Sequence, residues 1–251
     1  MKLPQGPVTY KYIEVGKTLY QAHSTRTPRF PARVAYFMLN ALFESVEGQI
    51  TLYDPFCGHG VLLVTAYLLF PERVQKVMGS DINPIVVETA RKNFQWLRDP
   101  NALEERLRAI QAYKTQDDVL KAIYQQRCRL MFNRAQERAL EVELFTHDAT
   151  QIGEILAATN SAVALVTDPP YARNDHWHPK SGIESADFGP LEPFLQQVGT
   201  APNVSTLLVC YRADGLSISP LLEKYFVVTP LPGTKGRAIY QCYHKLSPAL
   251  K

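Results

Sequence analysis

The sequence predicts an α/β protein in which strands and helices alternate and the sheet is mostly parallel. Three observations support this prediction. Apolar, β-prone runs recur along the chain, and four of them close on an aspartate, namely Asp54, Asp81, Asp148 and Asp168. Helix-like segments separate several of these runs. A turn with two glycines joins the first run to a helix, which is typical of a nucleotide-binding sheet. We expect the four carboxylates to meet at the carboxyl edge of the strands.

Length and composition limit the class of protein. A chain of 251 residues can form one α/β domain or a domain with an added arm, and 46% apolar residues suffice for its core. No segment approaches the roughly 18 consecutive apolar residues of a membrane helix. The first residues lack the apolar region of a signal peptide, so we expect a cytoplasmic protein. A net charge of +3 permits a nucleic-acid partner without establishing one.

The cysteines and histidines do not suggest a metal site or a disulfide framework. The four cysteines stand apart with no C-x-x-C pair. Cys210 and Cys242 lie in apolar runs, where a buried thiol fills a core. The histidines are scattered, apart from the pair in His176-Trp177-His178. We therefore expect no metal.

The N-terminal region, residues 1–45, is predicted to be a basic arm followed by a helix. Residues 1–29 carry five Lys or Arg, one acid and interleaved tyrosines. Such an arm suits RNA, although a strand packed on the domain edge is an equal alternative. Apolar residues at helical spacing predict a helix over 34–43. Arg33, at the start of this helix, gains nothing from the helix dipole, so it contacts a ligand or simply lies on the surface.

The first strand, residues 50–53, leads into the glycine turn. Gly58 and Gly60 allow backbone conformations that a side chain would block, and they let a ligand approach the start of the next helix. A dinucleotide-binding turn has a third glycine, whereas this chain has Leu63. Asp54 would repel a diphosphate but suits an ammonium group. The turn therefore favours S-adenosylmethionine (SAM), and a purely structural turn is the alternative.

Two further strands end in acids with distinct expected roles. The strand over 74–81 ends at Asp81, and a helix begins at Pro84, a good first-turn residue. Asp81 is placed to accept hydrogen bonds from ribose hydroxyls. Its alternative role is to cap that helix, a position that Asn83 also suits. A third strand, from Val142, ends at Asp148, which with Ala149 would lie beside an adenine.

Residues 99–138 interrupt this alternation and are predicted to be a helical insertion. The segment is polar and helix-prone. Arg127, Arg134 and Arg138 fall on one side of a helix. This basic stripe would hold phosphates or be an ordinary solvated face.

The strand over 162–167 is almost wholly apolar, as expected for a strand buried on both faces. It ends in Asp168-Pro169-Pro170-Tyr171. Two prolines make a stiff turn without free amide donors, so the carbonyls and the carboxylate act only as acceptors. A polar, aromatic loop follows to residue 182. The rest predicts a helix near 191–198 and strands over 205–211, 225–230 and 237–246, with a hairpin turn at 232–236.

Together these motifs resemble the class I SAM-dependent methyltransferases. The residues that carry the resemblance are Asp54-Pro55-Phe56-Cys57-Gly58-His59-Gly60, Ser80-Asp81-Ile82-Asn83, His147-Asp148-Ala149 and Asp168-Pro169-Pro170-Tyr171. Pairing the first motif with the last resembles amino-methyltransferases, which modify exocyclic amines of bases. The start Phe30-Pro31-x-Arg33, the charged insertion and a His-Trp pair resemble, more narrowly, the avilamycin-resistance methyltransferases, which act on a guanine of large-subunit ribosomal RNA.

The resemblance implies a fold, a cofactor and a set of site residues. The fold is a Rossmann-like sheet of seven strands, mostly parallel with an antiparallel C-terminal strand, over residues 46–251. The cofactor is SAM, and the partner is RNA, with ribosomal RNA as the leading candidate. The protein is expected to be a monomer. SAM-binding residues are Asp54, Pro55, Phe56, Cys57, Gly58, Gly60, Asp81, Ile82, Asn83, Asp148 and Ala149. Catalytic residues are Asp168, Pro169, Pro170 and Tyr171, and substrate contacts are Arg33, Arg173 and Trp177.

The mechanism follows from the acceptors of the proline turn. Asp168 and the Pro169 carbonyl would accept the two N–H bonds of a base amine and direct its lone pair at the methyl group. Tyr171 would stack on the extracted base. Three alternatives stay open: a DNA or small-molecule N-methyltransferase, a non-catalytic SAM- or RNA-binding module, and an NAD-dependent oxidoreductase, which Leu63 and Asp54 disfavour.

Overall fold

The protein is built around one seven-stranded sheet. The computed structural model describes residues 15–22, 30–114, 117–137, 140–169, 190–212, 217–234 and 236–245. The strands are β1 (Ile50–Asp54), β2 (Val74–Asp81), β3 (Glu141–Thr146), β4 (Val163–Thr167), β5 (Val204–Arg212), β6 (Phe226–Thr234) and β7 (Arg237–His244). Their order is β3-β2-β1-β4-β5-β7-β6. Strands β1 to β5 pair in parallel, and β7 runs antiparallel to both neighbours. The predicted Rossmann-like architecture is confirmed.

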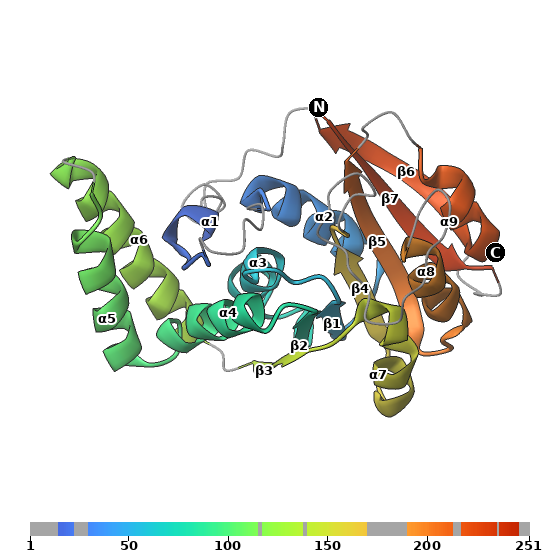
Figure 1. Ribbon diagram of the computed structural model, residues 1–251, viewed down its shortest axis with the longest axis horizontal. Coiled ribbons are helices and arrows are strands. Elements are labelled where there is room, and N and C mark those ends of the chain that lie inside the picture. Colours follow the sequence, from blue (N-terminus) through green and yellow to red (C-terminus); the bar gives the residue numbers. More distant parts are fainter. Residues whose placement is uncertain are drawn as a thin grey trace.

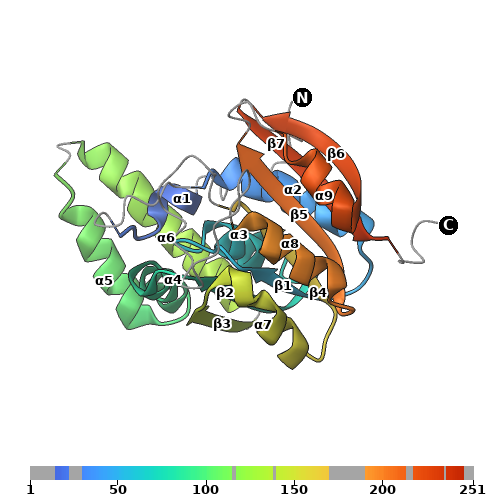
Figure 2. The ribbon, with the colours of Figure 1, turned by 45° about the vertical axis from the view of Figure 1, so that its right-hand side comes forward.

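Helices cover both faces of this sheet, as Figures 1 and 2 show. The helical elements are α1 (Val15–Thr18), α2 (Ala32–Ser45), α3 (Val61–Leu69), α4 (Pro84–Trp96), α5 (Pro100–Gln111), α6 (Asp118–Gln136), η2 (Ala149–Gln151), α7 (Ile152–Ala158), α8 (Leu191–Thr200) and α9 (Ser219–Tyr225). Helices α2, α3 and α4 share one hydrophobic core with the sheet, and α7, α8 and α9 form the core on the other face. Helices α5 and α6 lie at the opposite end of the molecule from β6 and β7 (Figure 1).

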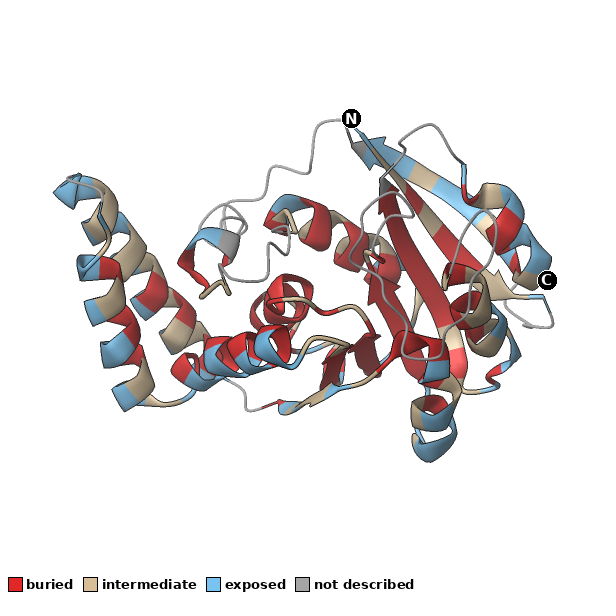
Figure 3. Cartoon of the chain, viewed as in Figure 1, coloured by how far each residue is buried: buried red, intermediate tan, exposed pale blue. Residues whose placement is uncertain are grey.

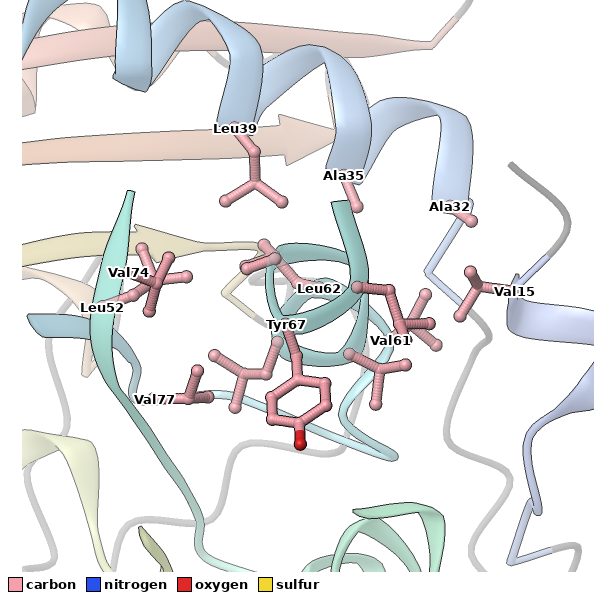
Figure 4. Packing of buried hydrophobic residues seen from close by; sticks show 14 of the residues in the cluster. Val15, Ala32, Ala35, Leu39, Leu52, Val61, Leu62, Tyr67, Val74 and Val77 are labelled. Carbon is pink, nitrogen blue, oxygen red and sulfur yellow. The ribbon is translucent and has the colours of Figure 1, made fainter. Parts of the chain in front are cut away.

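The middle of the sheet is the most deeply buried part of the fold (Figure 3). Every residue of β1 and of β4 is buried, as expected for strands covered on both faces. Ala35 and Leu39 of α2 point toward Leu62 of α3 and toward Leu52 and Val74 of the sheet (Figure 4). This packing fixes α3, and with it the glycine turn from which α3 begins.

Some element boundaries differ from the sequence expectation. Strand β3 ends at Thr146, because Asp148 already caps the short helix η2 through the amide of Thr150. Helix α9 was not predicted, because its seven residues are too few to show a clear helical period. Strand β6 extends to Thr234, into the segment expected to form a hairpin turn.

The segment expected to be a helical insertion contains α5 and α6, and the N-terminal helix α2 packs into the shared core. The division of the chain into an arm and a domain stays a prediction. Among the described residues, no helix has the length and apolar character needed to span a membrane.

Candidate functional site

Four aspartates lie where neighbouring parallel strands end. Asp54 closes β1 and Asp81 closes β2, while Asp148 and Asp168 follow β3 and β4. Because β3, β2, β1 and β4 are adjacent and parallel, these positions share the carboxyl edge of the sheet. The structure therefore assembles at one edge the acids that the sequence singled out. This edge is where open α/β sheets bind their ligands.

Asp54 is the most deeply buried of the four carboxylates, with 3% of its surface exposed. Its Oδ1 accepts hydrogen bonds from the Phe56 amide at 3.1 Å and from Thr167 Oγ1 at 2.8 Å. The pKa of Asp54 is raised to about 7, mainly by burial and also by the charges of Asp168 and Asp81, while these two hydrogen bonds act to lower it. The edge is thus crowded with negative charge and suits a cationic ligand.

The glycine turn is fastened to the end of β2. The Gly58 amide donates to Asp81 Oδ2 at 3.1 Å, and the Cys57 amide donates to the Ser80 carbonyl at 2.8 Å. Gly60 has a φ of 81°, and a Cβ there would lie 3.4 Å from Ala90 Cβ of α4. Glycine at this position lets α3 start close to α4 without strain. The amides at the start of α3 consequently lie at the edge that carries the acids.

Leu63 has a structural reason to stand where a dinucleotide turn has its third glycine. A Cβ on Gly79 of β2 would lie 2.4 Å from Leu63 Cδ1 and 2.8 Å from Leu144 Cδ2. In this fold the glycine is therefore Gly79 of β2, and the Leu63 side chain of α3 fills the space above it. Helix α3 and β2 still approach closely, which the third glycine achieves in dinucleotide-binding folds.

Asp81 and Asn83 divide two roles that the sequence left open. Asn83 Oδ1 accepts from the Ile85 amide at 3.0 Å and caps α4. Asp81 Oδ1 instead accepts from the Asn83 amide at 3.0 Å, so Asp81 is not the helix cap. Burial raises the pKa of Asp81, and three backbone hydrogen bonds oppose that rise. Ile82, between them, is half-buried at the same edge.

Asp148 and Ala149 are buried after β3, and a residue that the sequence did not indicate contacts the turn that follows them. Asp148 Oδ1 accepts from the amide and the hydroxyl of Thr150 at 3.0 and 2.8 Å. Gln197 of α8 donates to the Thr150 carbonyl, and its Oε1 accepts from the Gly153 amide at 2.8 Å. Gln197 therefore fixes this turn from another element, a role with no signal in the local sequence.

The proline turn is described as far as its second residue. Asp168 is half-buried and Pro169 is buried directly after β4. Pro170, Tyr171, Arg173 and Trp177 lie outside the described residues, so their roles stay predictions. Arg33 is exposed in the first turn of α2.

A second group that the sequence analysis missed ties the N-terminal segment to the glycine turn. Asn93 of α4 donates to the His59 carbonyl at 2.9 Å, and it exchanges hydrogen bonds with the backbone of Tyr20 at 2.7 and 3.2 Å. His59 Nε2 accepts from the Ala22 amide at 3.1 Å, so Nε2 is the unprotonated ring nitrogen. The only sequence signal was an asparagine on the apolar side of a helix.

Arg106 of α5 anchors the same segment from the insertion. It is buried, with 2% of its surface exposed. Its guanidinium donates to the Thr18 carbonyl at 2.8 Å and to the Tyr113 hydroxyl at 2.7 Å, and it lies 4.1 Å from the centre of the Tyr20 ring. Residues 15–22 are thus packed against the domain, and α5 helps to hold them.

The basic stripe expected on the insertion is partly used inside the protein. Arg134 Nε donates to the Leu68 carbonyl of α3 at 3.2 Å, and its guanidinium pairs with Glu137. Arg127 is half-buried, and Arg138 lies outside the described residues. Arg134 therefore attaches the insertion to α3, which the helical spacing alone did not reveal.

Comparisons with known proteins place this geometry in a family. The family model described as rRNA methyltransferase AviRa matches residues 8–219. A 23S rRNA (guanine(2535)-N(1))-methyltransferase from Streptomyces viridochromogenes is 27% identical over 205 residues, covering 77% of this chain and 78% of the relative. A ribosomal RNA large subunit methyltransferase K/L from Legionella pneumophila is 25% identical over 228 residues, which span 86% of this chain and 29% of that protein.

Solved structures share the fold. One crystal structure of the rRNA methyltransferase aviRa from Streptomyces viridochromogenes superposes with a TM-score of 0.72 at 23% identity, covering 95% of this chain and 94% of that one. A second structure of the same protein gives a TM-score of 0.67 at 24% identity, with 91% and 90% covered. These matches show that the chain shares the fold of those structures.

Proposed function

We propose, because this chain belongs to the rRNA methyltransferase AviRa family, that it transfers a methyl group from SAM to N1 of a guanine in 23S rRNA. The chain is an rRNA guanine N-methyltransferase. The sequence motifs predicted an exocyclic amine as the methyl acceptor. The name of the Streptomyces relative specifies the ring nitrogen N1, and the proposal adopts that atom.

The residues at the sheet edge fit SAM. Burial raises the pKa of both Asp54 and Asp81, so further negative charge at this edge is unfavourable and a positive charge is favourable. When bound, SAM would supply a methyl group carried on a sulfonium, whose sulfur departs as a neutral thioether. Asp54 would hold the ammonium end, with the turn formed by Pro55, Phe56, Cys57, Gly58 and Gly60 beside it. Asp81, Ile82 and Asn83 would hold the ribose, and Asp148 and Ala149 the adenine.

Asp168 and Pro169 would face the guanine. The Asp168 carboxylate would accept the N1 proton, and the Pro169 carbonyl would accept from the exocyclic amine. Because Pro169 has no N–H, this residue presents no amide donor that would compete with the base. N1 attacks as its proton leaves, so these acceptors favour the transition state over the neutral base. Tyr171 is proposed to stack on the base, and Arg33, Arg173 and Trp177 to contact the RNA.

One observation carries the proposal most directly. Asp54, Asp81 and Asp168 end three adjacent parallel strands, and the charges of Asp81 and Asp168 both act on buried Asp54. A cluster of this kind is costly unless a cation completes it. This cluster lies beside the turn formed by Asp168 and Pro169, whose carboxylate and carbonyl are acceptors. The arrangement supports a SAM site next to a base site.

Tritium-labelled SAM tests the proposal directly. The protein is incubated with separated large- and small-subunit rRNA, with DNA and with free nucleosides, and the products are digested to nucleosides. We expect label in 1-methylguanine from the large-subunit RNA. Label found only in DNA or in nucleosides would reject the rRNA substrate, and binding of SAM without transfer would favour a non-catalytic module. A monomer acting in the cytoplasm stays a prediction from the sequence.

A further inference from the structure

Arg237 lies at the same edge of the sheet as the proposed base site, although the motifs there do not include it. It is the first residue of β7, which pairs antiparallel with β5 and places Arg237 opposite Arg212, the last residue of β5. Strand β5 in turn runs parallel to β4. The start of β7 therefore coincides with the carboxyl ends of β4 and β5, where Asp168 stands.

The register also places Asp168 and Arg237 on one face of the sheet. Thr167 of β4 pairs with Val209 of β5, so the next residue, Asp168, continues beside Cys210. Cys210 pairs with Ile239 of β7, and Arg237 precedes Ile239 by two residues. Because side chains alternate along a strand, Arg237 shares a face with Ile239 and Cys210. Both of these belong to the core beneath α2 and α3.

Asp168 and Arg237 both act on the thiol of Cys210. Burial is the main cause that raises the pKa of this thiol. The Asp168 carboxylate raises it further, and the Arg237 guanidinium lowers it. A thiol that responds to both charges requires that the carboxylate and the guanidinium approach the same small region.

The guanidinium is positioned but incompletely satisfied. Its Cζ lies 5.8 Å from the centre of the Phe30 ring, in range for a cation–π contact. Its Nε is buried and has no hydrogen-bond partner within the described part of the chain. A buried donor of this kind is costly to leave unpaired, so it calls for a structural or functional explanation. Phe30 also opens the Phe30-Pro31-x-Arg33 segment.

We propose that Arg237 reads O6 of the target guanine and is the residue that distinguishes guanine from adenine. This inference rests on the proposed function. Along its Watson–Crick edge guanine presents the acceptor O6 and then the donors N1–H and N2–H₂. Arg237 is only a donor, and ionised Asp168 is only an acceptor. The two side chains thus complement guanine in order, donor to O6 and acceptor to N1–H.

Adenine is rejected by the same pair. At position 6 adenine carries an amine, which would set its donors against the donors of Arg237. Its N1 carries no proton and is an acceptor, so it cannot donate a hydrogen bond to the Asp168 carboxylate, which is also an acceptor. Discrimination through unpaired polar groups in a closed site is stronger than discrimination by shape. The acceptor-only proline turn cannot supply this distinction by itself.

Arg237 also faces the charge that develops on the base. As the N1–H bond breaks and its proton passes to the Asp168 carboxylate, the electron pair left on N1 is delocalised onto O6. A fixed guanidinium at O6 stabilises that negative charge. The arginine therefore contributes to turnover as well as to selection.

An atomic substitution in the RNA tests the contact. The methylated guanosine of a 23S rRNA fragment is replaced by 6-thioguanosine, whose sulfur is a weak acceptor. Wild-type protein and Arg237→Gln are compared on both RNAs by kcat/KM. We expect Arg237→Gln to lower kcat/KM on the normal RNA by about 100-fold, the scale for removing one preorganised donor. The sulfur substitution should reduce the wild-type value at least tenfold more than that of the variant, because the variant has already lost the contact.

Arg73→Gln is the matched control. Arg73 is also half-buried and lies over a phenylalanine, 5.2 Å from the centre of the Phe43 ring, but it precedes β2 at the other edge of the sheet. The sulfur substitution should lower kcat/KM of Arg73→Gln by the same factor as that of wild type, whatever the effect of this variant on stability. SAM affinity, measured by calorimetry, should be unchanged in Arg237→Gln if the variant is folded. If Arg237→Gln does not fold, Arg237→Lys keeps a charge without the planar fork and should lose most of the response to sulfur.

The outcomes separate the inference from the proposed function. If the wild-type protein methylates the guanine and the sulfur substitution costs wild type and variant the same factor, the role of Arg237 is rejected while the proposed function stands. If the wild-type protein transfers no methyl group to rRNA guanine, both are rejected.

Discussion

The amide of Gly58 donates to Asp81 Oδ2 at 3.1 Å, which fastens the turn after β1 to the end of β2. One carboxylate thus shapes the glycine turn and stands in the proposed ribose site. Since Asp81 Oδ1 also accepts from the Asn83 amide, the carboxylate is oriented before any ligand arrives. Because the site is already ordered, little of the binding free energy is lost in ordering it when the ligand binds.

Asp168 is expected to act in transfer and not in SAM binding. Asp168→Asn keeps the shape but cannot take the N1 proton, so the methylation rate should fall by about 100-fold to 10,000-fold. The dissociation constant for SAM, measured by calorimetry, should stay within about threefold of wild type, well under the tenfold that a lost contact of 1.4 kcal/mol would cause. Asp118→Asn, a change at an exposed carboxylate on α6, is the control. Wild-type turnover by Asp168→Asn would remove Asp168 from the mechanism.

SAM binding should strengthen as the pH rises toward neutrality. The pKa of Asp54 is about 7 in the unliganded protein, so the carboxyl is largely protonated at pH 6. An ammonium group beside it favours the ionised form and lowers this pKa on binding. Below pH 7 binding should therefore release protons, and the affinity should rise from about pH 6 to about pH 8, where an α-amino group begins to lose its own charge. Calorimetry in buffers of different ionisation enthalpy measures the release, which Asp54→Asn should abolish.

The same carboxyl should make the unliganded protein less stable as the pH rises. Its folded-state pKa, about 7, lies above the ordinary value of 3.8, so the folded protein binds more protons than the unfolded chain between these limits. The contribution of Asp54 to stability is therefore fully present below about pH 4 and is lost as the pH rises through about 7. Urea unfolding across this pH range should show the stability of wild type falling relative to that of Asp54→Asn as the pH rises. A difference that does not vary with pH would contradict the raised pKa.

Gly79→Ala should destabilise the protein through a steric clash. The new Cβ would meet Leu63 Cδ1 at 2.4 Å, Leu144 Cδ2 at 2.8 Å and Cys57 Cβ at 3.1 Å. Overpacking of this kind costs about 1 to 3 kcal/mol in the free energy of unfolding. Gly48→Ala is the control, because its Cβ would meet nothing within 4 Å and only its φ of 73° is strained. Adding Leu63→Ala to Gly79→Ala should cost less than the two changes summed, and simple additivity would show that the contact is not the cause.

Arg106 should be required for the N-terminal segment to stay in place. Arg106→Gln loses the charged hydrogen bonds to the Thr18 carbonyl and the Tyr113 hydroxyl and the contact with the Tyr20 ring, which together should cost about 2 to 4 kcal/mol. Arg108→Gln, an exposed change on the same helix, should stay within about 0.5 kcal/mol of wild type. Urea unfolding measures both, and limited proteolysis reports on residues 15–22. Equal stability of the two variants would show that Arg106 does not anchor the segment.

The success of the sequence analysis came from local patterns with a fixed structural meaning. An apolar run that ends in an acid places that acid at the carboxyl end of a strand, and parallel strands bring their carboxyl ends together. Asp54, Asp81, Asp148 and Asp168 could therefore be assigned to one edge of the sheet from the sequence alone. A residue lies at an edge of the sheet because of its position in a strand. The alternation of apolar residues and the length of the apolar run predict that position.

The sequence by itself thus determined the class of sheet, the acids at its edge and the glycine turn between β1 and α3. Only the tertiary structure decided which other side chains reach that edge. Arg237 reaches the edge that carries Asp168 because β7 inserts antiparallel between β5 and β6. Arg106 and Asn93 hold the N-terminal segment because α5 and α4 pack beside it. Hydrophobic periodicity records which face of an element is buried but carries no information about its neighbour, so contacts between distant segments are settled by packing alone.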